Sequence, residues 1–305
     1  MLETFLFLLL TPLGVERNGA CRWLNLAGVQ FQVAEVVKIG VIFFVAYMIH
    51  RHPSQARNPF LTIYIWIVGG MPAALLLFIS NDLSSSLVIL GMTFMLSLVY
   101  MKTPKLHLAM LILVIVAVGV IVCMVATNMP DPDSQTNFRI MRIAAWIDPE
   151  RYYKEAGFQT IQAKKAIISG SILGKGLGRS LQKWDKLPEA HTDMIFAVIC
   201  EELGALGAGL LIIGYVFLLY HVVKIAVNTE GLFESVLVTG VFGHLAIQIL
   251  FNIGVNLGLL PNTGLPLPLV SYGGTSVAFI LMEIGMVLKI QHRNKEREKR
   301  RMERT

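Results

Sequence analysis

Asp193 is the first residue to consider for chemistry, because it is a carboxylate at the start of an apolar run that continues to about Tyr220. One interpretation is that Thr192 or Asp193 caps the helix that follows, a common use of both residue types. The other is a partly desolvated carboxylate at a membrane edge, with a pKa raised toward that of a general base. His191 could tune this group or orient a substrate. The two interpretations are compatible, and we predict a catalytic role for Asp193.

Other charged residues occur inside apolar runs. Glu201 and Glu202 follow Asp193 by eight and nine residues, which places them about 12 to 14 Å further along a helix. A carboxylate within hydrocarbon costs about 2.5 to 3.5 kcal/mol, so both must face protein or a water-filled cavity. Glu35 and Lys38 are three residues apart and can pair on one helix face. For all four, a structural ion pair and a site-organising role both remain open.

A polar stripe with steps of four residues consists of His244, Gln248, Asn252 and Asn256. This spacing keeps the four side chains on one helix face. Hydrogen bonds between helices explain such a stripe, and so does a hydrophilic wall of a substrate cavity.

The segment LLPNTGLPLPLVSYGGTS, residues 259–276, contains three prolines and three glycines, which exclude a continuous helix. We expect an extended or reentrant approach and a helix that opens near residues 271–276. The N-terminus of that helix could hold an anion such as a phosphate, although a simple turn explains the pattern equally well. The candidate residues are Ser271, Gly273, Gly274 and Ser276. Basic residues of the preceding long loop, Arg142 and Lys175 among them, could supply the other half of an anion site.

The elements that position these residues are membrane helices. The 305-residue chain is 55% hydrophobic and only 15% charged, and its mean hydropathy is +0.64. Repeated apolar runs of about 18 or more residues predict an all-α, polytopic integral membrane helical bundle. We treat residues 1–305 as a single integral membrane domain. Its predicted spans are a partial one at 2–13 and full ones at 33–50, 60–79, 85–101, 106–127, 194–223, 234–258 and 268–290.

The basic loops predict the orientation. Lys and Arg occur in segments 50–59 and 102–105 and in the tail 291–305, whereas the opposite short loops, 80–84 and 259–267, have none. The positive-inside rule therefore places the C-terminus in the cytoplasm and the long loop 128–193 outside. We expect residues 157–171 of that loop to form an amphipathic helix at the membrane surface. The net charge of +6 reflects loop topology and a solvated tail, and it does not indicate a nucleic-acid partner.

Three long motifs carry a resemblance to a known family. They are NGACRWLNLAGVQFQVAEVVKIG, GKGLGRSLQKWDKLPEAHTDMIFAVICEELGALG and LPNTGLPLPLVSYGGTS. In order and spacing the sequence resembles the SEDS family of shape, elongation, division and sporulation proteins, typified by FtsW, RodA and SpoVE. The stretch KLPEAHTD favours the division type.

The resemblance implies a peptidoglycan glycosyltransferase that polymerises lipid II, a disaccharide-pentapeptide on undecaprenyl diphosphate, at the outer face of the bacterial cytoplasmic membrane. It implies that Asp193 is the catalytic base and that Glu35 and Lys38 are the embedded pair of the family. It further implies assistance by a divalent cation, Mg²⁺ or Mn²⁺, and a class B penicillin-binding protein as the transpeptidase partner. Because family members usually have about ten spans, we expect roughly two and a half spans to be missing at the N-terminus.

Two other functions remain as alternatives. A lipid II flippase would also need buried polar stripes and charges. A non-catalytic scaffold that recruits the transpeptidase would need neither a general base nor a donor site.

Overall fold

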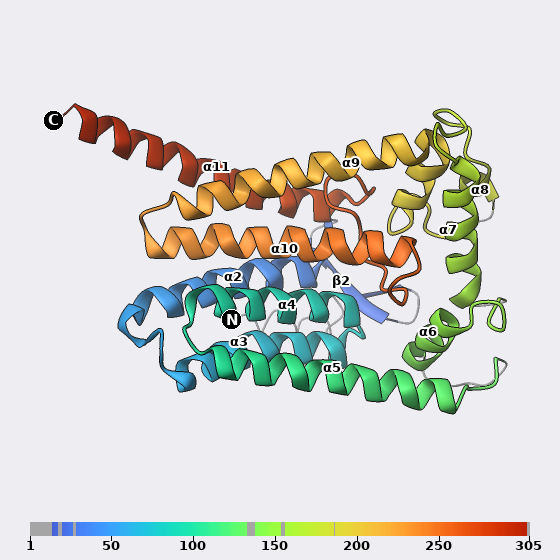
Figure 1. Ribbon diagram of the computed structural model, residues 1–305, viewed down its shortest axis with the longest axis horizontal. Coiled ribbons are helices and arrows are strands. Elements are labelled where there is room, and N and C mark those ends of the chain that lie inside the picture. Colours follow the sequence, from blue (N-terminus) through green and yellow to red (C-terminus); the bar gives the residue numbers. More distant parts are fainter. Residues whose placement is uncertain are drawn as a thin grey trace. The chain divides into compact units, whose positions relative to one another are not determined.

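The apolar runs of the sequence form helices in the computed structural model, which describes residues 14–17, 20–26, 29–132, 138–153, 156–185 and 187–303. Within these residues, seven helices are long and apolar enough to cross a membrane. They are α2 (Val33–Arg51), α3 (Pro59–Ile79), α4 (Leu83–Tyr100), α5 (Pro104–Thr127), α9 (Ile195–Val227), α10 (Leu232–Asn256) and α11 (Gly274–Met302), shown in Figure 1. Each corresponds to one predicted full span. The predicted partial span, residues 2–13, lies outside the described residues.

Short polar residues fix where two of these helices begin. Asn58 accepts a hydrogen bond from the backbone N–H of Phe60 at 3.0 Å, and Pro59 occupies the first turn of α3. Asp82 accepts one from the N–H of Ser85 at 3.0 Å and thereby caps α4. Both contacts satisfy amides that a helix leaves without partners at its N-terminus.

A three-stranded antiparallel sheet precedes α2, and the sequence analysis did not predict it. Its strands, in spatial order, are β1 (Gly14–Arg17), β2 (Ala20–Leu26) and β3 (Val29–Gln32). Arg22 on β2 donates to the carbonyls of Ser80 at 3.2 Å and Asn81 at 2.8 Å, which ties the sheet to the turn before α4. The strands are too short to produce a membrane-span pattern, and the Asn18–Gly19 dipeptide between β1 and β2 is the hairpin signal that could have revealed them.

Contacts within the chain group it into two compact units. The first contains residues 1–107, 217–247 and 273–305, and the second contains residues 108–216 and 248–272. Helices α5, α9 and α10 each contribute residues to both units. The single integral membrane domain predicted for residues 1–305 stays a prediction.

In the first unit, α2, α3 and α4 pack against one another, and the short 3-10 helix η2 (Pro53–Gln55) lies between α2 and α3 in sequence. Two glycines mark close helix approaches: Gly69 of α3 leaves no room for a Cβ atom beside Thr93, and Gly240 of α10 is similarly close to Ile42. Small residues at helix contacts are typical of membrane bundles.

The second unit contains the loop helices α6 (Phe138–Ile147), α7 (Ala156–Gly170) and α8 (Leu181–Asp185). Helix α7 contacts both of the others. It confirms that the segment predicted at 157–171 is helical, and its position at the membrane surface stays a prediction. Helices α6 and α8 were not predicted, because ten and five residues give little periodic signal.

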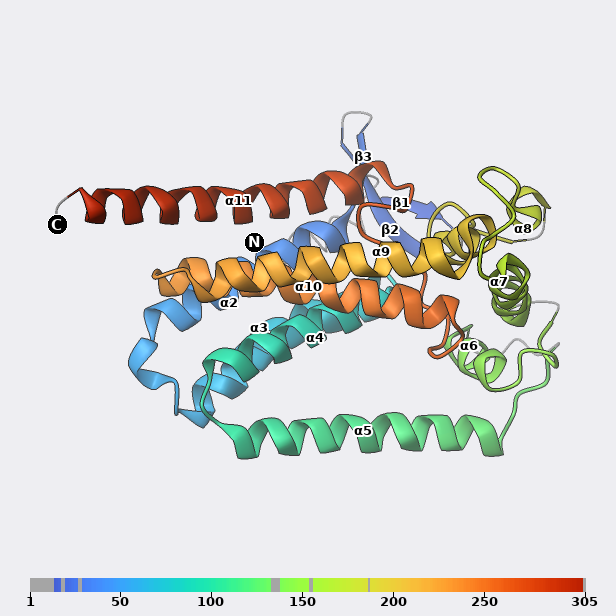
Figure 2. The ribbon, with the colours of Figure 1, turned by 45° about the horizontal axis from the view of Figure 1, so that its top comes forward.

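The last helix differs from its prediction at both ends. It begins at Gly274 and not at residue 268, because Pro266 and Pro268 keep the preceding segment out of a helix. It also continues to Met302 as one uninterrupted helix, so the predicted solvated tail is helical (Figure 2). Arg301 pairs with Glu230 in the link between α9 and α10, and Arg293 and Arg297, the latter at 3.6 Å, contact Glu234 in the first turn of α10. These contacts hold the C-terminal part of α11 in place.

Candidate active site

Asp193 lies in a turn that ends directly before α9. Its neighbour Met194 is fully buried in an apolar cluster with Ala197 and Val198 of α9 and with Ala163 and Ala166 of α7. The alanines allow α7 to approach closely, so the start of α9 is fixed by packing. The Asp193 backbone is thereby held on a rigid element.

Two amide side chains of α10 hold the backbone carbonyl of Asp193. Asn252 donates to it at 2.8 Å and Asn256 donates at 2.9 Å. Asn256 also accepts a hydrogen bond from the N–H of Ala197 at 3.0 Å. Within the described residues, therefore, Asn256 provides the capping acceptor for the first turn of α9. The Thr192 hydroxyl and the Asp193 carboxylate, which the sequence suggested as caps, make no such contact and stay available for other roles.

The irregular segment 262–272 is bound to the same place. Asn252 also donates to the carbonyl of Leu265 at 2.7 Å, and Gln248 donates to that of Pro266 at 3.0 Å. The hydroxyl of Ser271 donates to the carbonyl of Thr192 and accepts from the N–H of Leu267 at 2.6 Å. Gln248, Asn252, Asn256 and Ser271 thus form one hydrogen-bonded frame around residues 192–193, whereas His244 of the predicted stripe does not belong to it. The predicted reentrant or extended segment is indeed not helical.

The carboxyl group of Asp193 has an environment suited to proton transfer. The residue is only 8% exposed, and burial, with a smaller contribution from the negative charge of Glu189, raises its pKa to about 7. The Arg142 guanidinium and a hydrogen bond from Thr192 Oγ1 at 3.4 Å act in the opposite direction. A carboxyl group that exchanges a proton near neutral pH is able to act as a general base.

Gly264 borders this carboxyl group. Its φ of +71° lies in the left-handed region, and a Cβ atom placed there would be 3.5 Å from Asp193 Oδ2. Glycine therefore gives the backbone its turn and leaves space beside the carboxylate.

Arg142 reaches the site from α6. It donates to the carbonyl of Asn262 at 3.1 Å, while the Asn262 side chain donates to Gln159 of α7 at 2.6 Å. His191 is exposed, and its carbonyl accepts from the N–H of Tyr272 at 2.8 Å. The structure therefore places Asp193, His191 and Arg142 in one neighbourhood together with Glu189, Asn256 and Gly264, and their roles in a reaction stay predictions.

Glu201 is a structural centre of the preceding loop. It is fully buried, and Lys175 Nζ lies 2.6 Å from its Oε1. The carboxylate also accepts from the hydroxyls of Ser169 and Ser180 and from the backbone N–H groups of Leu181 and Gln182. The cation thus comes from the loop and not from another helix. Glu202 has a weaker contact, 3.9 Å from Lys183.

The break in α9 explains why carboxylates can occur there. Gly204 has φ +69° and ψ −171°, so the helix is interrupted. The freed carbonyls of Glu201 and Glu202 accept from the N–H groups of Lys175 and Gly176, and the N–H groups of Ala205 and Leu206 donate to residues 171 and 172. Non-helical backbone inside a membrane helix persists when protein groups satisfy it in this way.

A second polar cluster lies in the first unit. Lys38 Nζ is 2.8 Å from Glu35 Oε1 and 2.9 Å from His244 Nε2, and His244 Nδ1 is 2.8 Å from Glu283 Oε2. All four residues are at most 3% exposed. The predicted pairing of Glu35 with Lys38 is confirmed as a contact, and Glu283, which no sequence pattern indicated, extends this chain of polar contacts through His244.

The predicted anion site at the start of α11 has the expected local form. Gly273 precedes the helix in extended geometry without a side-chain cap, Gly274 begins it, and the Ser276 hydroxyl donates to the carbonyl of Gly273 at 3.1 Å. Its role as an anion site stays a prediction.

Comparisons with known proteins agree on one family. The model of the FtsW, RodA and SpoVE family, described as "Cell cycle protein", matches residues 1–296. The chain is 35% identical over 296 residues to a probable peptidoglycan glycosyltransferase FtsW of Thiomicrospira cyclica, covering 96% of this chain and 73% of that one. It is 31% identical over 290 residues to stage V sporulation protein E of Bacillus subtilis, covering 93% and 75%.

Two solved structures have the same fold. A chain in a structure described as the structural coordination of polymerization and crosslinking by a peptidoglycan synthase complex superposes with a TM-score of 0.74 at 27% identity, covering 96% of this chain and 80% of that one. The rod shape determining protein RodA of Thermus thermophilus superposes with a TM-score of 0.61 at 25% identity, covering 96% and 76%. The predicted class, a polytopic helical membrane protein, is thereby confirmed.

Proposed function

Because this chain belongs to the FtsW, RodA and SpoVE family of cell cycle proteins, we propose that it is a peptidoglycan glycosyltransferase that polymerises lipid II into glycan strands during cell division or cell-shape maintenance. The names of its relatives support the reaction, and the environment of Asp193 supports the chemistry. The observation that carries the proposal is a carboxyl group with a pKa of about 7 on a backbone fixed by Asn252 and Asn256.

Asp193 acts as the general base in this proposal. The acceptor sugar's hydroxyl attacks the anomeric carbon of the donor, and its proton passes to the Asp193 carboxylate. A new carbon–oxygen bond forms while the bond to the undecaprenyl diphosphate breaks, and the electron pair of that bond leaves with the diphosphate. Burial serves this step because it raises the proton affinity of the carboxylate.

Arg142 is the cation that we assign to the charge on the leaving diphosphate. Its guanidinium is near enough to lower the pKa of Asp193, and guanidinium groups bind phosphate oxygens in a bidentate manner. Lys175 is less suited to that role, because its ammonium group is engaged with Glu201 at 2.6 Å. His191, exposed next to the base, is the candidate for orienting the acceptor sugar.

A divalent cation, Mg²⁺ or Mn²⁺, is part of the proposal, and we propose that it binds together with the substrate. The described residues contain no group of three or more His, Cys, Asp or Glu side chains that could hold a metal ion. Magnesium in phosphate chemistry is often bound mainly by substrate phosphates and water, which is consistent with this. The cation would neutralise charge on the diphosphate.

The proposed location is the bacterial cytoplasmic membrane, with the C-terminus in the cytoplasm and Asp193 on the outer side. The basic segments 50–59, 102–105 and 291–305 support this orientation. We also propose a class B penicillin-binding protein as the partner that crosslinks the product, because a relative of known structure belongs to a complex that couples polymerization to crosslinking.

The test is polymerisation of lipid II by the purified chain, reconstituted in liposomes with its transpeptidase partner. Asp193→Asn should reduce the rate about 10²- to 10⁴-fold, the usual contribution of a general base. The matched control is Glu202→Gln, which neutralises another largely buried carboxylate of the same region and should retain activity.

Three outcomes would contradict the proposal. Equal polymerisation by the Asp193→Asn variant would contradict the role of Asp193 as the general base. Movement of labelled lipid II between leaflets without polymer would favour the flippase. Full complementation of a division or shape defect by the inactive variant would favour the scaffold.

A further inference from the structure

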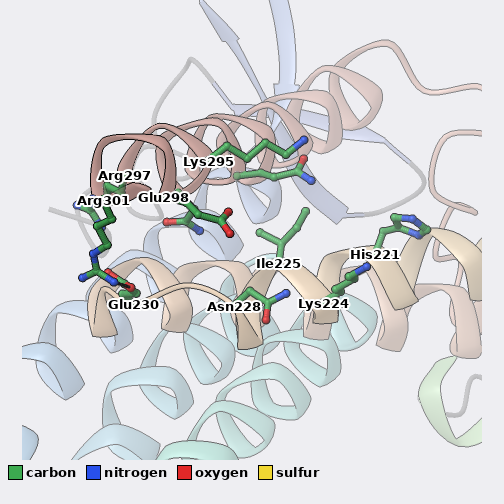
Figure 3. A pocket seen from close by; sticks show the side chains of 11 residues that line it. His221, Lys224, Ile225, Asn228, Glu230, Lys295, Arg297, Glu298 and Arg301 are labelled. Atoms are coloured by element: carbon green, nitrogen blue, oxygen red, sulfur yellow. Dashed lines mark hydrogen bonds and ion pairs between the residues drawn. The ribbon is translucent and has the colours of Figure 1, made fainter. Parts of the chain in front are cut away.

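A pocket in the first unit, remote in sequence from Asp193, contains charged groups that the proposed reaction does not use. It lies between the last turns of α9 and the charged C-terminal part of α11, from Gln291 onward (Figure 3). Its volume is about 740 Å³, within the range of pockets that bind small molecules. Its lining includes the polar side chains of Lys224, Asn228, Gln291, Lys295 and Glu298.

The pocket has an excess of positive charge. Four cationic side chains and two carboxylates line it, which leaves an excess of two positive charges with His221 neutral. Two of the cations are paired, since Arg301 contacts Glu230 and Arg297 lies 3.6 Å from Glu234.

Lys224 and Lys295 are different, because within the described residues neither makes an ion pair or a hydrogen bond through its side chain, and both are exposed. Figure 3 shows the two lysines on facing helices of the pocket. They offer six N–H donors to an anion that enters between them.

The pocket lies where both helices change from apolar to charged. On α9, the exposed Tyr220 comes directly before His221, and the exposed Val223 comes directly before Lys224. On α11, the exposed Leu288 comes directly before Lys289. Cations at the ends of membrane helices lie at the level of lipid headgroups. A ligand with an anionic head and an apolar tail therefore matches the charged and the apolar parts of these two helices.

We propose that this pocket binds an anionic phospholipid of the surrounding bilayer. Lys224 and Lys295 contact its phosphate oxygens, and the amides of Asn228 and Gln291 contact neighbouring polar groups of the head. The acyl chains run along the exposed apolar surfaces of Tyr220 and Leu288. Basic pockets between membrane helices are known to accept such headgroups.

The test is native mass spectrometry of the full chain, titrated in detergent with phosphatidylglycerol and, separately, with phosphatidylcholine. Lys224→Gln with Lys295→Gln should weaken phosphatidylglycerol binding by about tenfold or more, given that each lysine near an anionic headgroup contributes substantially. Replacing both by arginine should preserve binding, since the charge is kept.

A matched control removes two other lysines, Lys102 and Lys105, which are also exposed and belong to the basic segment 102–105. This double Gln variant should change the affinity less than twofold (roughly the scale of surface charge effects). An equal loss of phosphatidylglycerol affinity in both double variants would show general attraction to basic surfaces and would overturn the proposal of a lipid site in this pocket.

Glu298 provides a test in the opposite direction. It is a pocket carboxylate without a hydrogen bond or ion pair in the described part of the chain, so Glu298→Gln should strengthen phosphatidylglycerol binding several-fold. Unchanged affinity in this variant, or equal affinity for phosphatidylcholine, contradicts the proposal. Displacement of the lipid by millimolar inorganic phosphate or glycerol phosphate would identify a soluble phosphate as the occupant and reject the lipid.

Discussion

The carboxyl group of Asp193 becomes mostly ionised only above about pH 7, because burial raises its pKa. A base must be deprotonated before it accepts the acceptor's proton, so kcat/KM for lipid II polymerisation should rise with pH and level off above a midpoint near 7. The measurement is the initial rate of glycan formation between pH 5.5 and 9. A flat profile over this range would contradict the assignment.

Two neighbouring charges should move that midpoint in opposite directions. Glu189 raises the pKa of Asp193 and Arg142 lowers it. Glu189→Gln should therefore shift the activity midpoint to lower pH, and Arg142→Gln should shift it to higher pH. The position of the midpoint separates this effect from any fall in the maximal rate. Shifts in the same direction in both variants would mean that the profile reports another group.

The same burial makes Asp193 costly to ionise in the folded protein. Its folded pKa of about 7 exceeds its usual value of 3.8, so the folded state binds the proton more tightly than the unfolded state. This contribution to stability is complete below pH 3.8 and is lost as pH rises toward 7. Asp193→Asn, which does not titrate, should gain about 2–3 kcal/mol relative to wild type between pH 5 and pH 7, at about 1.4 kcal/mol per pKa unit.

Thermal unfolding in detergent at the two pH values checks this expectation. The advantage of the Asn variant should be larger at pH 7 than at pH 5 and constant above pH 8. An advantage of equal size at both pH values would show that the carboxyl group is solvated.

At the scale of elements, Asn256 links α10 to the start of α9. Asn256→Ala removes the acceptor for the Ala197 N–H and one of the two amide donors to the Asp193 carbonyl. The carbonyl keeps Asn252, so the N–H is the group left unsatisfied, at a cost of about 1–3 kcal/mol. We expect a lower unfolding midpoint and a lower kcat, because the base loses its fixed position. Asn128→Ala, which changes an exposed amide just after the end of α5, should leave both values unchanged.

The loop between α7 and α8 depends on Glu201. Glu201→Gln weakens its contact with Lys175, and because the Lys175 side chain is 28% exposed, the cost should lie below about 3–5 kcal/mol, the cost for a fully buried ion pair. We expect trypsin to cleave at Lys175 and Arg179 several-fold faster, because the loop opens more often. Glu202→Gln is the control, since its carboxylate lies 3.9 Å from Lys183. Equal cleavage in both variants would assign the effect to charge in general.

Much of this arrangement could be predicted from the sequence. Helix periodicity and length predicted the seven long helices, and steps of four residues placed Gln248, Asn252 and Asn256 on one face. The sequence could not show that this face binds the carbonyl of Asp193, because residues 193 and 252 are far apart in the chain. The break at Gly204 was also missed, since one glycine in an apolar run gives little signal until the loop that satisfies it is known.

Across the whole chain, two buried carboxylates are paired with a lysine of their own unit. Glu35 is paired with Lys38 in the first unit, and Glu201 is paired with Lys175 in the second. Charges paired in this way can be kept in a membrane, whereas unpaired ones are found at its edges. The distribution of lysines and arginines over the short connecting loops therefore indicates the orientation.

Labelling of introduced cysteines tests that orientation. In a chain with Cys21, Cys123 and Cys200 replaced by serine, a cysteine at Leu177, a highly exposed residue of the loop between α7 and α8, should react in intact spheroplasts with a membrane-impermeant maleimide. A cysteine at Ser54, in the basic segment 50–59, should react only after lysis, because short basic loops stay in the cytoplasm. Labelling of position 54 in intact cells would show that the orientation is the reverse of the proposed one. Asp193 would then lie on the cytoplasmic side, where it could not serve polymerisation outside the membrane. Labelling of both positions only after lysis would likewise reject an outer location for the loop that leads to Asp193.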